Sequence, residues 1–264
     1  MVGFRTALSW MTIIPVKAPD EVDRALGVRT VRAIPLVGVV LGLFCGLVSW
    51  GFASIAIPWP ITGIVITTLL AVLTRGMHVD GLADTIDGLG SYQEPDEARE
   101  IMRDGRVGPL GLTAVVLALI AEALAFGLLS THNGHIMTGT VVAVARWATP
   151  LMCAAGASQV PRRGFGYLMI GTQRPAFAWV VAGIGALLFT CAAAITSALC
   201  GRIPDVSVVV ALLYSAAAVV GTVLYRQHCV RRLGYLTGDV LGANVELLQA
   251  CGAVAAVCAV TALL

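Results

Sequence analysis

The chain has 264 residues, of which 58% are hydrophobic and only 12% charged, with a formal net charge of +2. Because about a quarter of the residues in a soluble domain are charged, this composition excludes an ordinary soluble protein and favours one domain, residues 1–264, embedded in a bilayer. The small net charge does not indicate nucleic-acid binding, and the seven cysteines lack CxxC spacing, so they predict neither disulfides nor a metal site.

The first element in chain order is a short N-terminal helix. Phe4, Leu8 and Met11 recur at spacings of four and three, which places them on one helical face. This pattern predicts an amphipathic helix on the membrane surface, with a disordered terminus as the alternative.

Long apolar runs then dominate the chain and predict an all-α, polytopic bundle of about seven transmembrane helices. Each run is about long enough to cross the roughly 30 Å hydrocarbon core of a bilayer. Gly38, Gly42 and Gly46 are spaced four apart in the first run, which predicts close helix packing within the chain or in a homo-oligomer. The seven predicted spans cover residues 33–57, 61–77, 107–130, 136–157, 176–200, 206–225 and 240–264.

The basic residues predict the orientation of this bundle. If the N-terminus is cytoplasmic, every Lys and Arg except Arg146 and Arg202 falls before the first span or in a loop on the inner side. Loops on the cytoplasmic side of membrane proteins carry an excess of Lys and Arg. The pattern therefore predicts a cytoplasmic N-terminus.

Residues 75–111 form a long polar stretch between the second and third predicted spans, on the cytoplasmic side. Within it Asp80, Asp84 and Asp87 recur at i, i+4 and i+7, so on a helix they fall within a sector of roughly 60°. Like charges so placed repel one another, and a bound cation relieves the repulsion; carboxylate oxygens are the ligands that Mg²⁺ prefers. The spacing predicts a Mg²⁺ site, with a solvated acidic helix face as the alternative.

A short cytoplasmic helix is predicted from Glu94 to about Asp104. It has Pro95 and acidic residues at its start and arginines at its end, as the helix dipole favours. Arg103 and Arg106 then lie in a glycine-rich segment, and one guanidinium group can bind two phosphate oxygens at once. This segment predicts a phosphate-binding partner for the metal site. A positive-inside anchor is the alternative for the arginines.

Three further ionisable residues lie at or inside the predicted spans. His78 precedes Asp80 by two residues, so we expect it on the opposite side of that helix, as a hydrogen-bonded histidine or a substrate contact. Glu122 and Arg146 lie at similar depths and are predicted to form an ion pair, with an anionic substrate as the alternative partner of Arg146.

The last predicted span begins with a second acidic pattern. Asp239 and Glu246 are seven residues apart and share a helix face. A glutamate about two turns inside the membrane needs a partner, so this pair predicts a second acidic contribution to the same metal site.

Three of these segments resemble the signature segments of a known family. HVDGLADTIDG (78–88), IMRDGRVGPLG (101–111) and LTGDVLGANVE (236–246) are similar to segments of cobalamin synthase, the adenosylcobinamide-GDP ribazoletransferase family. The resemblance extends to SWMTIIPV (9–16), AIPLVGVVLG (33–42) and GFG (164–166), and so to most of the chain.

The resemblance implies an integral enzyme of the bacterial cytoplasmic (inner) membrane or its archaeal counterpart, with its site on the cytoplasmic side. α-Ribazole, or its 5′-phosphate, would displace GMP from adenosylcobinamide-GDP, and Mg²⁺ would be required. The resemblance, together with the spacing, implies phosphate binding by Arg103 and Arg106. Arg146, as a contact of an anionic substrate, and Glu246, as a further acid near the metal, are secondary site candidates. A carboxylate such as Asp80 or Asp84, or else His78, would accept the hydroxyl proton. The implied Mg²⁺ ligands are Asp80, Asp84, Asp87, Asp104 and Asp239.

Two other functions fit parts of the pattern. A CDP-alcohol phosphotransferase also holds metal with aspartates on a membrane helix, but its motif has an arginine soon after the Asp-Gly pair, where this chain has Ala83 and Asp84. A transporter or cation channel would need ionisable residues along a path near the bilayer midplane, and only Glu122 and Arg146 qualify.

Overall fold

The structure is a computed structural model that describes residues 1–17, 19, 21–156 and 164–261. These residues are mainly helical, and one isolated bridge joins Ala154 to Gln173. The all-α prediction is confirmed. The helices are α1 (Val2–Met11), α2 (Arg24–Ser54), α3 (Trp59–Leu73), α4 (Met77–Gly90), α5 (Pro95–Arg103), α6 (Pro109–Thr131), α7 (His135–Trp147), α8 (Thr149–Met152), α9 (Phe165–Met169), α10 (Pro175–Leu199), α11 (Asp205–Leu233) and α12 (Gly238–Thr261).

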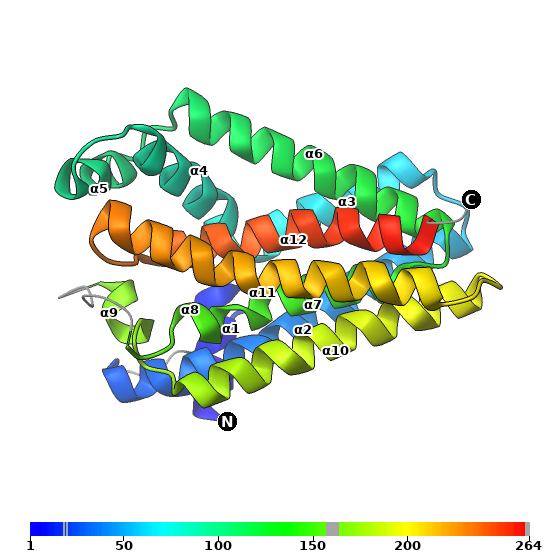
Figure 1. The fold of residues 1–264 in the computed structure, drawn as a ribbon, viewed down its shortest axis with the longest axis horizontal. Coiled ribbons are helices and arrows are strands. Elements are labelled where there is room, and N and C mark those ends of the chain that lie inside the picture. Colours follow the sequence, from blue (N-terminus) through cyan, green and yellow to red (C-terminus); the bar gives the residue numbers. More distant parts are fainter. Residues whose placement is uncertain (18, 20, 157–163, 262–264) are drawn as a thin grey trace.

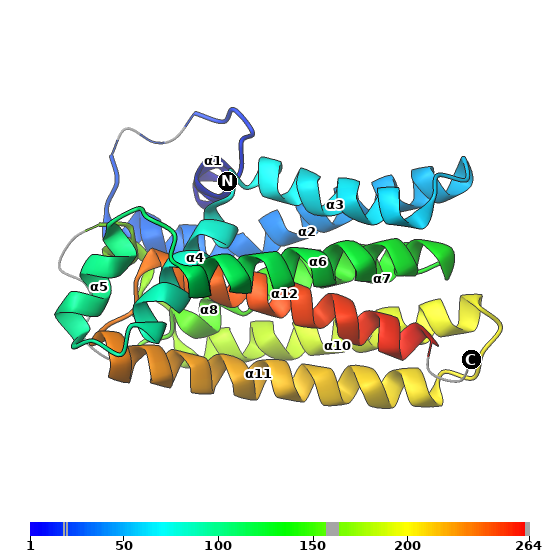
Figure 2. The same cartoon turned by 90° about the horizontal axis from the view of Figure 1, so that it is seen from above.

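The long helices lie side by side along the long axis of the molecule (Figures 1 and 2). α2 packs against α7, and α3 packs against α6. α12 contacts α4, α6, α7 and α11, so it occupies the centre of the bundle. The short helices α4, α5 and α9 gather at one end, which we call the α5 end (Figure 1).

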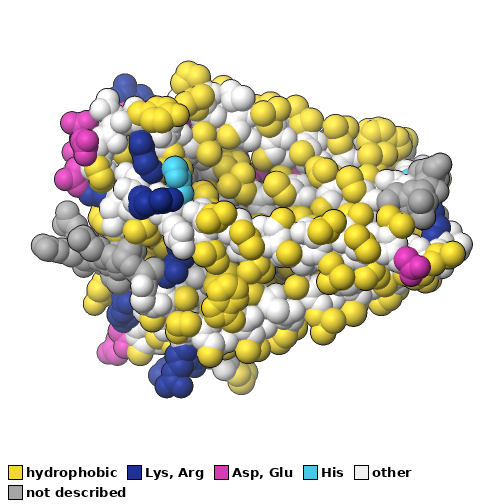
Figure 3. Space-filling view, in the orientation of Figure 1, with side chains coloured by type: hydrophobic (Ala, Val, Ile, Leu, Met, Phe, Trp, Pro, Cys, Tyr) yellow, Lys and Arg dark blue, Asp and Glu magenta, His cyan; other side chains and the backbone are white. Residues whose placement is uncertain are grey.

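The surface of the bundle matches a bilayer. Five helices, α2, α6, α10, α11 and α12, are long and apolar enough to cross a membrane. Hydrophobic side chains cover the visible long face, whereas charged side chains gather mainly at the α5 end (Figure 3). The chain is therefore a multi-pass membrane protein.

The number of spans depends on how α3 and α4 are counted. α3 and α4 are bent by 86° relative to each other, and counting them as one broken span raises the number of candidate spans from five to six. α7, with 13 residues, is shorter than the ~20 residues that a span needs. The count of seven spans and the cytoplasmic N-terminus stay predictions.

Several helix boundaries differ from the predicted ones. α2 begins at Arg24, well before residue 33, because the Asp23 side chain accepts a hydrogen bond from the Leu26 N–H at 2.7 Å and caps the helix. α11 continues to Leu233 instead of residue 225. The predicted span over 136–157 is divided into α7 and α8, and its last residue, like residues 262–264 of the last span, lies outside the described residues.

The elements that position the polar stretch agree with the sequence. Helices over Phe4–Met11, the Asp80–Asp87 segment and Pro95–Arg103 are all confirmed. The glycine spacing in α2 also has its predicted role: a Cβ on Gly42 would lie 2.2 Å from the Gly139 carbonyl oxygen, so only glycine allows α2 and α7 to approach this closely.

Candidate active site

A cavity of about 400 Å³ opens at the α5 end of the bundle. Its volume is typical of small-molecule sites, which range from roughly 300 to 1,000 Å³. Side chains from α1, α2, α4, α5, α7, α9 and α12 line it, so segments far apart in the sequence meet there. Among its lining residues are five that the sequence singled out: His78, Asp80, Arg103, Arg146 and Asp239.

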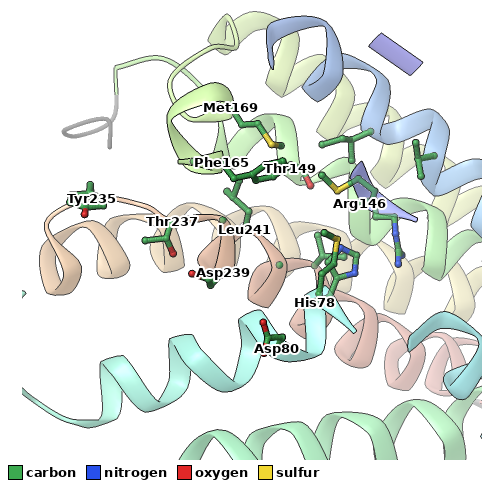
Figure 4. A pocket seen from close by; sticks show the side chains of 18 of the residues that line it. His78, Asp80, Arg146, Thr149, Phe165, Met169, Tyr235, Thr237, Asp239 and Leu241 are labelled. Atoms are coloured by element: carbon green, nitrogen blue, oxygen red, sulfur yellow. The ribbon is translucent and has the colours of Figure 1, made fainter. Parts of the chain in front are cut away.

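Asp80 and Asp239 bring two carboxylates to this cavity from different helices. Asp80 lies on α4 and Asp239 at the start of α12, on the same side of the cavity (Figure 4). Gly81 makes this approach possible, because a Cβ there would lie 2.6 Å from the Asp239 carbonyl oxygen and 3.1 Å from its Cα. The two acidic segments therefore meet at one cavity through Asp80 and Asp239, and their joint binding of a metal stays a prediction.

Asp84 lies one turn further along α4, outside the cavity lining but close to the same charges. Burial, followed by the negative charges of Asp80, Asp239 and Asp87, raises the pKa of Asp84 to about 6. The Asp84 carboxyl therefore lies close to three other carboxylates, two of which line the cavity.

This arrangement fits a divalent cation in part. Within the described residues, no three His, Cys, Asp or Glu side chains converge on one point. Mg²⁺ is commonly bound through one or two carboxylates, with water and substrate phosphates as its other ligands. Asp80 and Asp239 meet that requirement, and Asp84, which interacts with both charges, is a further donor; their chemistry suits Mg²⁺.

Asp87 has a different set of partners. Its Oδ2 accepts a hydrogen bond from the Gly108 N–H at 2.7 Å, and its Oδ1 accepts one from the Gly111 N–H at 2.8 Å. Gly108 is the N-cap residue of α6 and Gly111 lies in its first turn, and the N–H groups at these positions have no partner within the helix. Asp87 therefore caps α6 and joins it to α4.

We expect Asp87→Ala to reduce the free energy of unfolding by about 1–2 kcal/mol, because it removes a side-chain cap from a helix N-terminus. Thermal unfolding in detergent measures this loss, with Glu100→Ala, an exposed change on α5 outside its first turn, as the control. Unchanged stability together with a weaker Mg²⁺ dependence would instead identify Asp87 as a metal ligand.

Arg103 is placed at the cavity by contacts between α5 and the loop after α11. Its Nη2 donates to the Tyr235 hydroxyl at 3.2 Å. Arg99 lies 4.3 Å from the centroid of the Tyr235 ring and donates to the Leu233 carbonyl, which ties α5 to this loop. Arg103 is thus held at the mouth of the cavity, as a phosphate ligand should be.

Asp104 and Arg106 lie outside the cavity lining. The Arg106 Nη2 lies 2.6 Å from the Asp104 Oδ2, and the Arg106 side chain is 85% exposed. The structure therefore pairs Asp104, a predicted Mg²⁺ ligand, with Arg106, a predicted phosphate ligand. Neither residue lines the cavity with Asp80.

His78 differs from its expected placement. It was expected on the opposite side of α4 from Asp80, but both residues line the same cavity, because the cavity wraps around the first turn of the helix (Figure 4). Burial, and next the positive charge of Arg146, lower the pKa of His78 to about 3. The imidazole is therefore neutral at ordinary pH and is a weak base.

The predicted direct ion pair between Glu122 and Arg146 is wrong. Gln249 lies between them: its Nε2 donates to Glu122 Oε1 at 2.9 Å, and its Oε1 accepts from Arg146 Nη1 at 2.9 Å. Glu246 lines a small cavity of about 10 Å³ beside Glu122 and Arg146 instead of the main cavity. Of the Asp239 and Glu246 pair, only Asp239 joins the predicted metal site.

Comparison with known proteins identifies the family. Residues 3–257 match the protein family described as cobalamin-5-phosphate synthase. The chain belongs to this family. It is an enzyme of cobalamin synthesis.

Curated relatives support this membership over nearly the whole chain. The chain is similar to an adenosylcobinamide-GDP ribazoletransferase of Corynebacterium efficiens, at 30% identity over 98% of the chain and 91% of the relative. Enzymes of the same name from Frankia casuarinae (32% identity; 95% of the chain, 92% of the relative) and Syntrophobacter fumaroxidans (31%; 97% and 98%) are also similar. No solved structure matches the chain. This family membership leaves the CDP-alcohol phosphotransferase and transporter interpretations without support.

Two parts of this cobalamin synthase family site were missed in the sequence. Gln249 is buried in an apolar helix, three residues after Glu246, and a buried amide at that spacing is a usable signal. Met169 of α9 forms part of the cavity wall, and α9 is too short for its periodicity to be recognised. Phe165, on the same helix and the same wall, belongs to the GFG segment (164–166) that contributed to the resemblance.

Proposed function

We propose that this enzyme transfers the adenosylcobinamide phosphoryl group from adenosylcobinamide-GDP to a ribose hydroxyl of α-ribazole or its 5′-phosphate. The products are adenosylcobalamin, or its 5′-phosphate, and GMP. The observation that carries this proposal is the cavity in which two carboxylates, Asp80 and Asp239, lie with the guanidinium group of Arg103. The names of the curated relatives support the donor and the acceptor.

The carboxylates are the proposed Mg²⁺ site. Asp80 and Asp239 would hold the ion, with Asp84 as a further ligand. Held there, Mg²⁺ would neutralise charge on the diphosphate oxygens and on the leaving GMP. Asp87 and Asp104, the other two predicted ligands, have the partners described above, so they are the weaker candidates.

The other residues of the cavity bind and orient the substrates. Arg103 at the mouth holds donor phosphate oxygens, and the α-ribazole hydroxyl must lie in line with the bond that breaks. That hydroxyl loses a proton during attack. A carboxylate of the cavity is the better acceptor, because the low pKa of His78 makes the imidazole a weak base.

We place the cavity on the cytoplasmic side of the inner membrane. Charged side chains gather at the α5 end, where the cavity opens (Figure 3). An excess of Lys and Arg marks the cytoplasmic side of membrane proteins, which supports this orientation.

A direct assay tests the proposed reaction. The purified protein in detergent, with Mg²⁺, adenosylcobinamide-GDP and α-ribazole 5′-phosphate, is expected to release GMP and to form a corrinoid that carries both substrates' parts. Chelation by EDTA should stop the release and added Mg²⁺ should restore it, because water and the protein do not neutralise the diphosphate alone. GMP release that is unaffected by EDTA would contradict the metal requirement, and no release under any condition would contradict the reaction.

A further inference from the structure

Arg146 is a buried cation at the inner wall of the main cavity. Its side chain lies on α7, and the residue is only 3% exposed, yet it contributes to the cavity lining (Figure 4). Its Nη1 donates to the Val142 carbonyl at 2.7 Å and to Gln249 Oε1 at 2.9 Å. Over the described ranges, it forms no salt bridge with a carboxylate.

Residues on the side of Arg146 away from the main cavity hold its guanidinium group in place. Gln249 accepts from Arg146 and donates to Glu122, so an amide fixes the orientation of the arginine and a carboxylate fixes the orientation of the amide. The small cavity of about 10 Å³ beyond these residues has room for about one water molecule. On the side of α2, a Cβ on Gly38 would lie 3.2 Å from the Arg146 Cβ, so the stem of the side chain is also tightly packed.

Glu122 and Glu246 lie close enough to interact with the charge of Arg146, and all three residues line the small cavity, but neither carboxylate forms a salt bridge with the guanidinium group among the described residues. A buried guanidinium group is costly unless its N–H donors are hydrogen-bonded. Arginine has five N–H donors, and among the described residues only those on Nη1 have a partner. The Asp80 and Asp239 carboxylates lie on another side of the cavity (Figure 4). An anion inside the cavity would accept hydrogen bonds from the free donors of Arg146.

The position of Arg146 restricts which anion this is. The two phosphates of adenosylcobinamide-GDP lie between guanosine and cobinamide, so each has a bulky group on both sides. Behind Arg146, at the inner end of the main cavity, there is room for about one water molecule. A phosphate that binds there must therefore be terminal, because a group on its far side would have no space. The acceptor nucleotide carries such a group at its 5′ position and is small enough for a cavity of about 400 Å³.

We propose that Arg146 binds the terminal 5′-phosphate of the acceptor nucleotide, and that Gln249, supported by Glu122, is the positioning residue that aims Arg146 at it. This proposal rests on the proposed function, because it assigns a part of the same site. It makes Arg146 a specificity-determining residue that distinguishes α-ribazole 5′-phosphate from α-ribazole.

Direct binding tests the assignment without turnover. Calorimetric titration of the purified protein in detergent, without donor, compares α-ribazole 5′-phosphate with α-ribazole. We expect the phosphorylated compound to bind the parent protein about 30-fold more tightly, from charge-assisted hydrogen bonds, and Arg146→Met to remove that difference. Arg231→Met, an exposed change at the end of α11, is the matched control and should keep the difference.

Steady-state kinetics separate the positioning role from a structural one. Gln249→Leu should raise KM for α-ribazole 5′-phosphate about tenfold, while kcat and KM for α-ribazole change less than threefold. This variant also tests the proposal if Arg146→Met does not fold. A rise in KM for adenosylcobinamide-GDP, or equal rises for both acceptors, would overturn the assignment.

Failure of the proposed reaction and failure of the Arg146 assignment appear in different measurements. If the parent protein releases no GMP, the proposed function is contradicted, whereas the titrations still compare the two acceptors. Equal affinity of the parent protein for both compounds would overturn the role of Arg146 even where GMP is released.

Discussion

Replacing Asp80 with asparagine should lower kcat/KM for GMP release by about three orders of magnitude. Asparagine keeps the shape of the side chain but removes its charge, and loss of one preorganised electrostatic group at a reacting centre costs about 10²–10³-fold in rate. Asp80 lines the cavity together with Asp239 of the adjoining helix, and it is the one carboxylate of α4 in that lining. The measurement is initial GMP release at increasing Mg²⁺ concentration.

The matched control for this change is Asp205→Asn. Asp205 is the first residue of α11, and it is exposed and lies at the opposite end of the bundle from the cavity (Figure 1), so its replacement leaves the cavity unchanged. The variant should keep parental activity. If Asp80→Asn remains folded and as active as Asp205→Asn at every Mg²⁺ concentration, the metal site does not include Asp80.

The local elements of the site were predictable because their signals are local. Asp80, Asp84 and Asp87 share a helix face whatever surrounds them, and Pro95 with the charge order after it defines α5. Composition gave the membrane class for the same reason. The glycines of α2 also identified a packing face, although not the helix that meets it.

The partners of each polar group were less predictable, because they depend on long-range packing. Asp87 belongs to the same spacing pattern as Asp80, but its carboxylate accepts hydrogen bonds from N–H groups at the start of α6 instead of lining the cavity. Glu122 and Arg146 lie at similar depths, as expected, but α12 inserts Gln249 between them. A helical period gives the face on which a side chain lies and not the helix that it meets.

The second large effect on activity is expected from replacing Gly81, a residue without a side-chain functional group. Gly81→Ala should lower kcat by about 100-fold, since a shift of about 1 Å in the site is enough for such a loss. The new Cβ would meet backbone atoms of Asp239, at 2.6 Å from the carbonyl oxygen, so α4 and α12 must separate. Separation moves the Asp80 carboxylate away from Asp239, and GMP release by the purified, folded variant measures the consequence.

Two glycines distinguish this effect from loss of stability. Gly221→Ala is the neutral control, because a Cβ there has no atom within 4 Å, and alanine also favours the helix. Gly63→Ala is the destabilising control: its Cβ would lie 1.8 Å from the Ala123 carbonyl oxygen, between α3 and α6 and outside the cavity lining. We expect Gly63→Ala to lower the unfolding temperature while the folded fraction keeps its kcat. If Gly81→Ala behaves in the same way, close contact between α4 and α12 stabilises the bundle but does not set the distance between the two carboxylates.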